Sequence, residues 1–218
     1  MEVSPSFELI LDRGNTFLWT DEVRLSTDAP KRTTPVHFHP QTELVWFRKV
    51  AGSVLLDGRS YPLRDRQAVL LPSMQVHAFD TGTGPRSWVL LQFEPYLVES
   101  LHEEAPQLAG GSPLILSPDP EASARIDFLC DWLCAISTLP DRVREAQQVT
   151  TLILVALMAA SSTVGTSIHS VRPHPLPLRD ALRRIHADPR TAPTVSEAAR
   201  TARVTDAHFS RTFKARIG

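Results

Sequence analysis

The stretch Pro35-Val36-His37-Phe38-His39-Pro40-Gln41-Thr42-Glu43-Leu44-Val45-Trp46-Phe47 decides most of what the sequence predicts about the fold. His37 and His39 are separated by one residue, so on a β-strand both side chains point to the same face. After Pro40 the chain continues into the short apolar run Glu43–Phe47, which predicts a second strand. Two histidines and a carboxylate are thereby expected on neighbouring strands.

Short apolar runs of this kind fill the chain on both sides, from Phe7 to about Tyr96. They are rich in Val, Leu, Phe and Trp and are separated by turn residues. The pair Asp57-Gly58 lies between two of them and is a hairpin signal. Many short strands at this spacing predict an all-β barrel or sandwich. The other runs are Phe7–Leu11, Ser53–Leu56, Ala68–Leu71 and Trp88–Phe93.

From Pro118 the apolar residues recur at helical spacing. We expect Ser117 or Asp119 to cap this helix and Pro140 to end it. A second helix is predicted from about Arg142 to Ser162. It is apolar on more than one side, so it needs more than one neighbour, either the barrel and the first helix or a second subunit. Residues 164–177 contain alternating prolines and are predicted to be a linker.

The net charge of −1 over 218 residues hides a split between the two ends of the chain. Residues 178–218 carry nine Lys and Arg against four Asp and Glu, a net charge of +5, whereas residues 1–177 sum to −6. A short basic module behind a proline-rich segment is typical of a nucleic-acid-binding segment. A nucleic acid is therefore an expected partner, and the helix-turn-helix pattern described below makes it double-stranded DNA.

Two cysteines four residues apart, Cys130 and Cys134, do not make a disulfide framework, which favours a reducing compartment. On an apolar helix face they are expected to be buried, inert thiols rather than a redox sensor. The N-terminus lacks the pattern of a signal peptide, and the longest helix-like apolar run is too short for a bilayer. We expect a cytoplasmic protein with no membrane partner.

The segment Thr194–Gly218 has the layout of two short helices. Thr194 and Glu197 form a capping-box pattern, and Thr205 is expected to cap the second helix. The small Ala198 and Ala199 allow close crossing, with Phe209 and Phe213 on the inner face. This layout predicts a helix-turn-helix with a polar recognition helix; the alternative is a helical hairpin with a solvated basic face. The outward-facing candidates for DNA binding are Thr205, Ala207, His208, Ser210, Arg211 and Lys214.

The run from Ala198-Ala199 through Val204-Thr205 and His208-Phe209-Ser210-Arg211 to Phe213-Lys214 resembles the first helix-turn-helix of AraC/XylS-type transcription regulators. The resemblance implies that Ala207, Ser210 and Arg211 read bases and that Arg211 makes a bidentate guanine contact. Arg203, Lys214 and Arg216 would meet phosphates. Arg203 stands where the family has a turn glycine. The family's second motif would follow Gly218, so we expect a truncated reader that binds its operator weakly or not at all.

His-x-His-x3-Glu at His37, His39 and Glu43, followed by His77, resembles the conserved motifs of cupin barrels. In metal cupins these four residues bind a metal, whereas the AraC-type sensor barrel commonly keeps them without one, so no metal and no cofactor are expected. The structural alternative is that they only hydrogen-bond one another. The expected effector site comprises His37, His39, Glu43, Trp46 and His77. Strand register decides whether Trp46, or Val45 and Phe47, faces inward.

We therefore predict a β-then-α chain with a cupin-like effector-binding barrel over 1–117 and a helical packing and dimerisation region over 118–163. The linker over 164–177 then leads to a truncated AraC-type helix-turn-helix domain over 178–218. The predicted function is a homodimeric, ligand-responsive transcription regulator that is not an enzyme, with a small-molecule effector. An alternative is a small metal-dependent cupin enzyme, an oxygenase or isomerase, using the three histidines and Glu43. A third is a chain that acts only by forming inactive mixed dimers with a full-length regulator.

Overall fold

The computed structural model describes residues 6–7, 18–26, 28–56, 58–101, 112–161, 190, 192–201 and 204–217. Its strands form two sheets. The inner sheet has the order β11 (Leu114–Leu116), β8 (Gln67–Leu71), β5 (Thr42–Lys49), β10 (Arg86–Phe93) and β2 (Leu18–Leu25). The outer sheet has the order β1 (Ser6–Phe7), β4 (His37–Phe38), β9 (His77–Thr81), β6 (Gly52–Leu56) and β7 (Arg59–Leu63), with β3 (Arg32–Thr33) also paired to β9.

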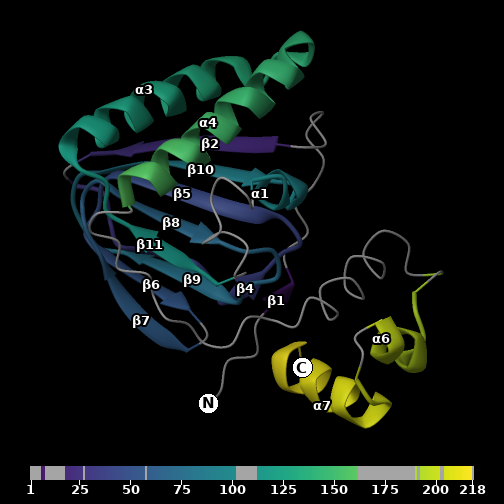
Figure 1. Cartoon of the computed structure of the whole chain (residues 1–218). Coiled ribbons are helices and arrows are strands. Elements are labelled where there is room, and N and C mark those ends of the chain that lie inside the picture. The colour runs from purple at the N-terminus through teal and green to yellow at the C-terminus, as the bar shows by residue number, and fades with distance from the viewer. Residues whose placement is uncertain are drawn as a thin grey trace.

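Two long helices, α3 (Pro120–Ile136) and α4 (Val143–Ser161), cover one face of the inner sheet, so the molecule has three layers here (Figure 1). The other face of the inner sheet packs against the outer sheet. One apolar core therefore lies between the helices and the inner sheet, and a second lies between the two sheets. A short helix, α1 (Tyr96–Glu99), follows β10.

The strand-rich N-terminal part and the helices after it are confirmed, but the expectation of a closed barrel is wrong. In the described ranges, the edge strands β2 and β11 pair only within the inner sheet. The chain passes from the inner to the outer sheet between β5 and β6, at Gly52, which has a φ of 152°. A side chain at Gly52 would collide with the carbonyl oxygen of Asp80 on β9, so only glycine fits this close approach. The predicted hairpin is present, with β6 and β7 antiparallel on either side of Gly58.

The helix boundaries follow the expected capping chemistry. Of the two candidate caps for α3, Asp119 is the one used, because its side chain accepts a hydrogen bond from the Ala122 backbone at 2.8 Å. Ser117 instead accepts a hydrogen bond from Gln67 at 3.0 Å. The helix ends at Ile136, before Pro140, which begins a 3-10 turn, η1 (Pro140–Arg142). The predicted second helix is α4.

The C-terminal part contains two short helices, α6 (Val195–Thr201) and α7 (Asp206–Ile217). The Thr194 backbone N–H donates to the Glu197 carboxylate at 2.8 Å, and the Glu197 N–H donates to the Thr194 hydroxyl at 3.2 Å, which is the expected capping box. The Thr205 hydroxyl accepts from the His208 N–H at 3.3 Å. The predicted linker over 164–177 and the turn residue Arg203 lie outside the described residues.

None of the helices in the described ranges is both long enough and apolar enough to cross a membrane.

Candidate functional site

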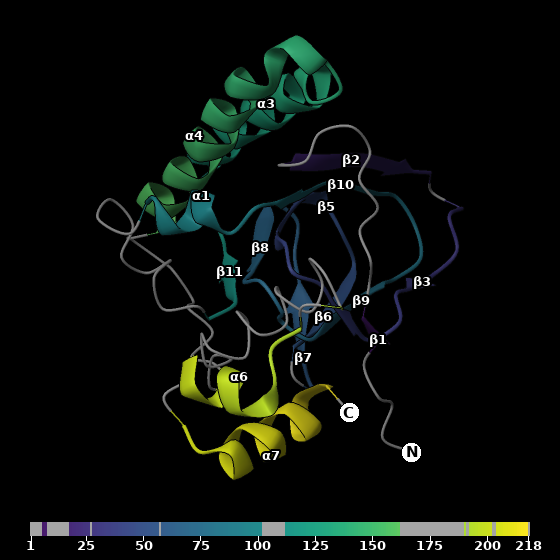
Figure 2. The same ribbon diagram turned by 90° about the vertical axis from the view of Figure 1, so that its right-hand side faces the viewer.

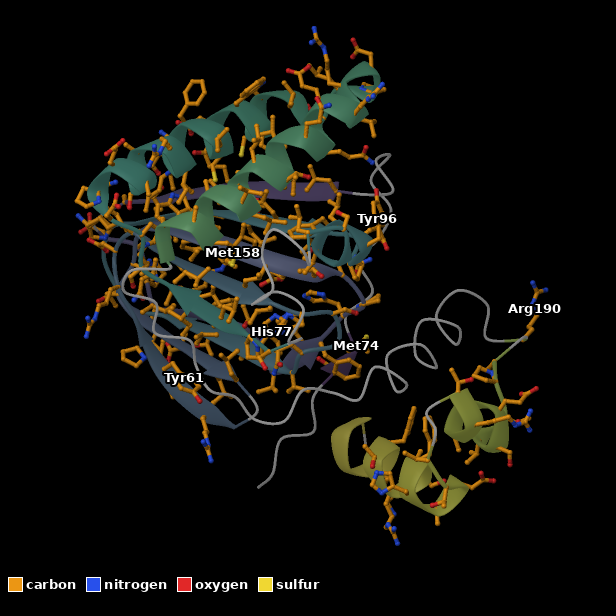
Figure 3. All side chains as sticks on the ribbon, viewed as in Figure 1. Tyr61, Met74, His77, Tyr96, Met158 and Arg190 are labelled. Atoms are coloured by element: carbon orange, nitrogen blue, oxygen red, sulfur yellow. The ribbon has the colours of Figure 1, made fainter. Side chains whose placement is uncertain are left out.

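Four of the five residues expected at the effector site come together between the two sheets. His37 on β4 is paired directly with His77 on β9, and His39 follows two residues later on the same segment. Glu43 lies near the start of β5, on the face of the inner sheet that meets the outer sheet. Figure 3 places His77 inside the sandwich. His39, Glu43 and His77 are each at most 2% exposed, and His37 is partly buried.

Each of the three imidazoles is held in the same way, by its Nδ1 atom facing a backbone carbonyl oxygen. The partners are Pro35 for His37 at 2.8 Å, Gln41 for His39 at 3.2 Å, and Gln75 for His77 at 2.8 Å. Because a carbonyl oxygen only accepts hydrogen bonds, Nδ1 carries the proton in neutral His37 and His77, and their Nε2 atoms carry the lone pair. His39 differs, because both of its ring nitrogens face acceptor oxygens.

The ring nitrogens and Glu43 meet at one place. One ligand atom from each histidine lies within 4.8 Å of those of the other two. The Nε2 atom of His39 is 3.1 Å from Glu43 Oε2, and the Nε2 atom of His77 is 3.7 Å from Glu43 Oε1. The latter two atoms, His77 Nε2 and Glu43 Oε1, are buried and have no hydrogen-bond partner. Buried polar atoms without partners are costly, so this pair marks a place suited to a ligand.

Glu43 contributes a buried negative charge to the cluster at neutral pH. Burial by itself would raise the pKa of Glu43, but the charge of His77 and the hydrogen bond to His39 outweigh it and hold the pKa at about 2. Burial lowers the pKa of His77 to about 4, despite the attraction of Glu43. Glu43 is therefore ionised and His77 neutral at pH 7.

Gln92 on β10 completes the cluster and is not among the site residues predicted from the sequence. It is opposite Glu43 in the antiparallel pair of β10 and β5. Its side-chain amide donates to Glu43 Oε2 at 2.8 Å and lies 3.4 Å from His39 Nε2. The apolar run Trp88–Phe93 predicts a strand, and Gln92 is the one polar residue in it. A single polar side chain in such a run is the sequence feature that could have indicated its role.

Trp46 does not join this cluster. Along β5, Glu43, Val45 and Phe47 face the outer sheet, so Trp46 faces the helices instead. Its indole N–H donates to Asp127 of α3 at 2.8 Å, and Trp46 is fully buried in the core beneath the helices. The expectation that Trp46 contacts the effector is corrected by this register, and Val45 and Phe47 take the inward positions.

All six residues predicted to bind DNA are exposed and lie in α7 or just before it. They are Thr205, Ala207, His208, Ser210, Arg211 and Lys214. The opposite side of the two helices is apolar, with Ala198, Ala199 and Phe209 buried. Phe209 and Phe213 have ring centroids 6.1 Å apart. These six exposed residues thus lie away from the apolar side of the two helices.

The apolar side of α6 and α7 is part of one cluster with residues next to the histidines. Phe38 and Met74, each at most 2% exposed, belong to the same apolar cluster as Ala198, Ala199 and Phe209. Met74 lies at the end of the sandwich that is nearer to α6 and α7 (Figure 3), and Figure 2 shows these two helices below the sandwich. Its backbone N–H donates to the carbonyl of His39 at 2.8 Å. The segments that carry the histidines therefore also contact the C-terminal helices.

Helices α3 and α4 carry exposed apolar side chains on the side away from the sheets. Phe128 is 66% exposed and Leu152 49%. The Phe128 and Trp132 rings lie 6.2 Å apart between centroids. Val155 on α4 is also exposed, as is Leu139, which lies between α3 and η1. We call these five residues the helical apolar patch.

Both cysteines are on α3, with Cys130 buried and Cys134 half-buried. Burial raises the pKa of the Cys130 thiol well above its usual range and that of Cys134 to about 11. Both are therefore protonated thiols at neutral pH.

The comparisons with known proteins agree with this architecture. The family model described as the AraC-like ligand binding domain matches residues 20–160. A structure of ToxT from Vibrio cholerae is similar with a TM-score of 0.58 and 8% identity, covering 92% of this chain and 76% of that chain. ToxT with a bound unsaturated fatty acid gives a TM-score of 0.57 and 12% identity, covering 94% and 76%. The AraC-like transcriptional activator CuxR gives a TM-score of 0.52 and 14% identity, covering 89% and 70%.

A search of curated proteins finds no match to this chain. At these identities the solved structures show the fold alone. The family model, however, matches residues 20–160, which is well over half of the chain. It begins in β2 and ends within α4, so the match includes the inner sheet, most of the outer sheet and the helices that cover the inner sheet. The chain belongs to the family of proteins with an AraC-like ligand binding domain.

Proposed function

We propose that this chain is a transcription regulator of AraC type whose sensor domain binds a small-molecule effector between the two sheets. The observation that carries the proposal is the pair of buried, unpartnered atoms, His77 Nε2 and Glu43 Oε1, in a domain of a ligand-binding family. The effector would occupy the space beside His37, His39, His77 and Glu43, with Val45 and Phe47 on its apolar side. The chain then acts through binding rather than as an enzyme.

In this proposal α6 and α7 form a helix-turn-helix, with α7 as the recognition helix. The capping hydrogen bonds at Thr194 and Thr205, the buried inner face and the exposed polar face of α7 support it. Arg211 would read a guanine through its two guanidinium donors, and Lys214 would contact a phosphate.

Selection from a pool of random DNA duplexes at low salt, followed by anisotropy titration of the selected duplex, tests the DNA-binding part. Arg211→Ala should lose about 1–3 kcal/mol of discrimination at one base pair. Lys214→Ala should weaken binding to all sequences alike and reduce the salt dependence. Failure of the wild-type chain to enrich any sequence would refute the assignment.

The apolar cluster of Phe38 and Met74 with α6 and α7 supports a route from the effector site to the DNA-binding helices. His37 and Phe38 are adjacent on β4, so a ligand that moves one moves the other. Met74→Ala should speed amide hydrogen exchange in α6 and α7, because it removes part of the apolar contact. Met158→Ala on α4, an equally buried methionine, is the matched control and should affect α4 alone. Equal effects of both variants on α6 and α7 would contradict the route.

The helical apolar patch supports homodimerisation through α3 and α4. Exposed apolar patches of this kind mark interaction sites. Leu152→Glu should convert a dimer to a monomer in sedimentation velocity. Val195→Glu on α6 changes a residue that is 48% exposed, against 49% for Leu152, and should leave the dimer intact. A wild-type chain that is monomeric at high concentration would refute this part of the proposal.

A further inference from the structure

We propose that the effector of this sensor domain is a primary amine with an apolar, aromatic tail, whose ammonium group binds between Glu43 and His77. The effector site itself belongs to the proposed function, on which this assignment rests, and the chemical class of the ligand is what is added here. The site is short of hydrogen-bond donors, so the ligand must supply them.

Two buried atoms of the cluster accept hydrogen bonds and have no partner. Glu43 Oε1 is an oxygen of an ionised carboxylate, and His77 Nε2 carries a lone pair because Nδ1 of the same ring donates to the carbonyl of Gln75 at 2.8 Å. The two atoms are 3.7 Å apart, too far for a hydrogen bond between them. Both side chains are at most 2% exposed, so bulk water does not reach them. A ligand group that donates to both atoms removes the cost of burying them.

The neighbouring side chains do not supply the missing donors. Gln92 donates to the other carboxylate oxygen, Glu43 Oε2, at 2.8 Å, and His39 Nε2 lies 3.1 Å from that same oxygen. A His39 ring protonated on both nitrogens satisfies its contacts with Gln41 and Glu43 Oε2, but the two unpartnered atoms stay unpartnered. In the described part of the chain, the ion-pair partners of Glu43 are both histidines.

The chemistry of the two acceptors selects an ammonium group over other polar groups. A carboxylate or phosphate brings no donor and is repelled by the ionised Glu43, and a hydroxyl brings one donor for two acceptors. A primary ammonium has three donors on one nitrogen and a charge that compensates the buried carboxylate. A nitrogen about 2.9 Å from both atoms sees them at about 80°, against about 109° between two N–H bonds, so each hydrogen bond bends by about 15°.

A row of aromatic rings leads away from His77, which lies inside the sandwich (Figure 3), and indicates the nature of the tail. Ring centroids are 5.8 Å apart for His77 and Phe79, 5.8 Å for Phe79 and Phe47, and 6.2 Å for Phe47 and Trp88. Phe47 and Phe79 are part of the core between the sheets, and Trp88 packs against that core but is only partly buried. An aromatic tail fits along these rings, whose faces also attract a nearby cation.

The test measures the binding of matched probes to the full 218-residue chain by isothermal titration calorimetry at pH 7. The probes 2-phenylethylamine, 2-phenylethanol and 3-phenylpropanoate share the phenylethyl group and differ in the polar end, which is an ammonium, a hydroxyl or a carboxylate. We expect the amine to bind at least about tenfold more tightly than the alcohol, and the carboxylate not to bind. Methylammonium, which lacks the tail, should bind at least about tenfold more weakly than 2-phenylethylamine.

The variants separate this site from surface binding. Glu43→Gln keeps the size of the side chain but removes its charge, and should lower the affinity for 2-phenylethylamine at least about tenfold, with folding checked by circular dichroism. Glu121→Gln on α3, at a side chain that is 84% exposed, is the matched control and should bind the amine like the wild type. Trp88→Leu should weaken binding of 2-phenylethylamine but not of methylammonium. If Glu43→Gln does not fold, nuclear Overhauser effects between the methylene protons of the amine and the His77 ring in the wild-type chain replace it.

Unchanged amine binding in folded Glu43→Gln, or no such effect at His77, overturns the assignment. No binding of the amine also overturns it and would mean that a buried water molecule satisfies the two atoms. Tighter binding of the alcohol or the carboxylate refutes the amine but leaves an effector site standing.

The DNA selection described above is read separately. A chain that selects DNA but binds none of the probes refutes the amine and leaves the DNA-binding part of the proposed function standing. A chain that binds the amine but selects no DNA refutes the regulator and leaves the amine site standing.

Discussion

The indole of Trp46 gives the sharpest test of the register of β5. Its N–H donates to Asp127 at 2.8 Å from a fully buried position, and Asp127 also accepts a hydrogen bond from Arg48 at 3.1 Å. A hydrogen bond to a charged group contributes about 1.5–3 kcal/mol, and replacing the indole by a phenyl ring also leaves a small cavity. Trp46→Phe should therefore lower the free energy of unfolding by about 2–4 kcal/mol.

A double-mutant cycle with Asp127→Ala isolates the hydrogen bond from the packing change. The carboxylate of Asp127 is 29% exposed, which weakens the interaction, so we expect a coupling free energy of about 1–2 kcal/mol. Urea unfolding followed by circular dichroism at 222 nm measures it without relying on tryptophan fluorescence. Trp88→Phe, on the opposite face of the inner sheet, is the matched control and should couple to Asp127 by less than about 0.5 kcal/mol. Coupling near zero between Trp46 and Asp127 would refute this register of β5.

Three further predictions follow from local geometry. Gly52→Ala should lower the free energy of unfolding in urea by more than about 3 kcal/mol, because the new methyl group meets the Asp80 carbonyl. Gly58→Ala is the control, since Gly58 has a φ of 83° with open space around it, and it should cost about 1–2 kcal/mol. Equal costs would contradict the close approach at Gly52. Thr194→Ala should remove the capping box and destabilise α6 by about 1 kcal/mol, which would appear as roughly fivefold faster amide hydrogen exchange in α6. Unchanged exchange would mean that the cap contributes nothing to the stability of α6. At pH 8 the Cys134 thiol, whose pKa is about 11, should react with iodoacetamide about 100-fold more slowly than a thiol with a pKa of 9, because its thiolate is correspondingly rarer. Cys130 should react only after unfolding. Rapid labelling of both cysteines in the native protein would contradict their burial.

The sequence predicts local features well where a short-range rule controls them. The Asp119 cap, the Thr194 and Glu197 capping box and the hairpin at Gly58 depend on residues close in the chain, and each is present. The convergence of the three histidines with Glu43 was also predictable, because strand alternation and the resemblance to a known motif both indicated it.

Long-range register is where prediction from the sequence failed. Alternation shows that Trp46 and its neighbours face opposite sides, but not which side is which, and the deciding partner Asp127 is 81 residues away. Gln92 meets Glu43 across 49 residues, through the pairing of β10 with β5. Closure of the strands into a barrel or two sheets likewise depends on how edge strands meet, which no local pattern specifies.

The enclosure of the cluster has a consequence for timing. His39, Glu43 and His77 are each at most 2% exposed, so a molecule can enter or leave only when the surrounding strands and the 72–76 segment open. Binding that waits for such an opening is slower than encounter by diffusion, and departure requires the same opening. A ligand held in this way would exchange slowly, so that its occupancy would follow the recent average of its concentration rather than brief fluctuations.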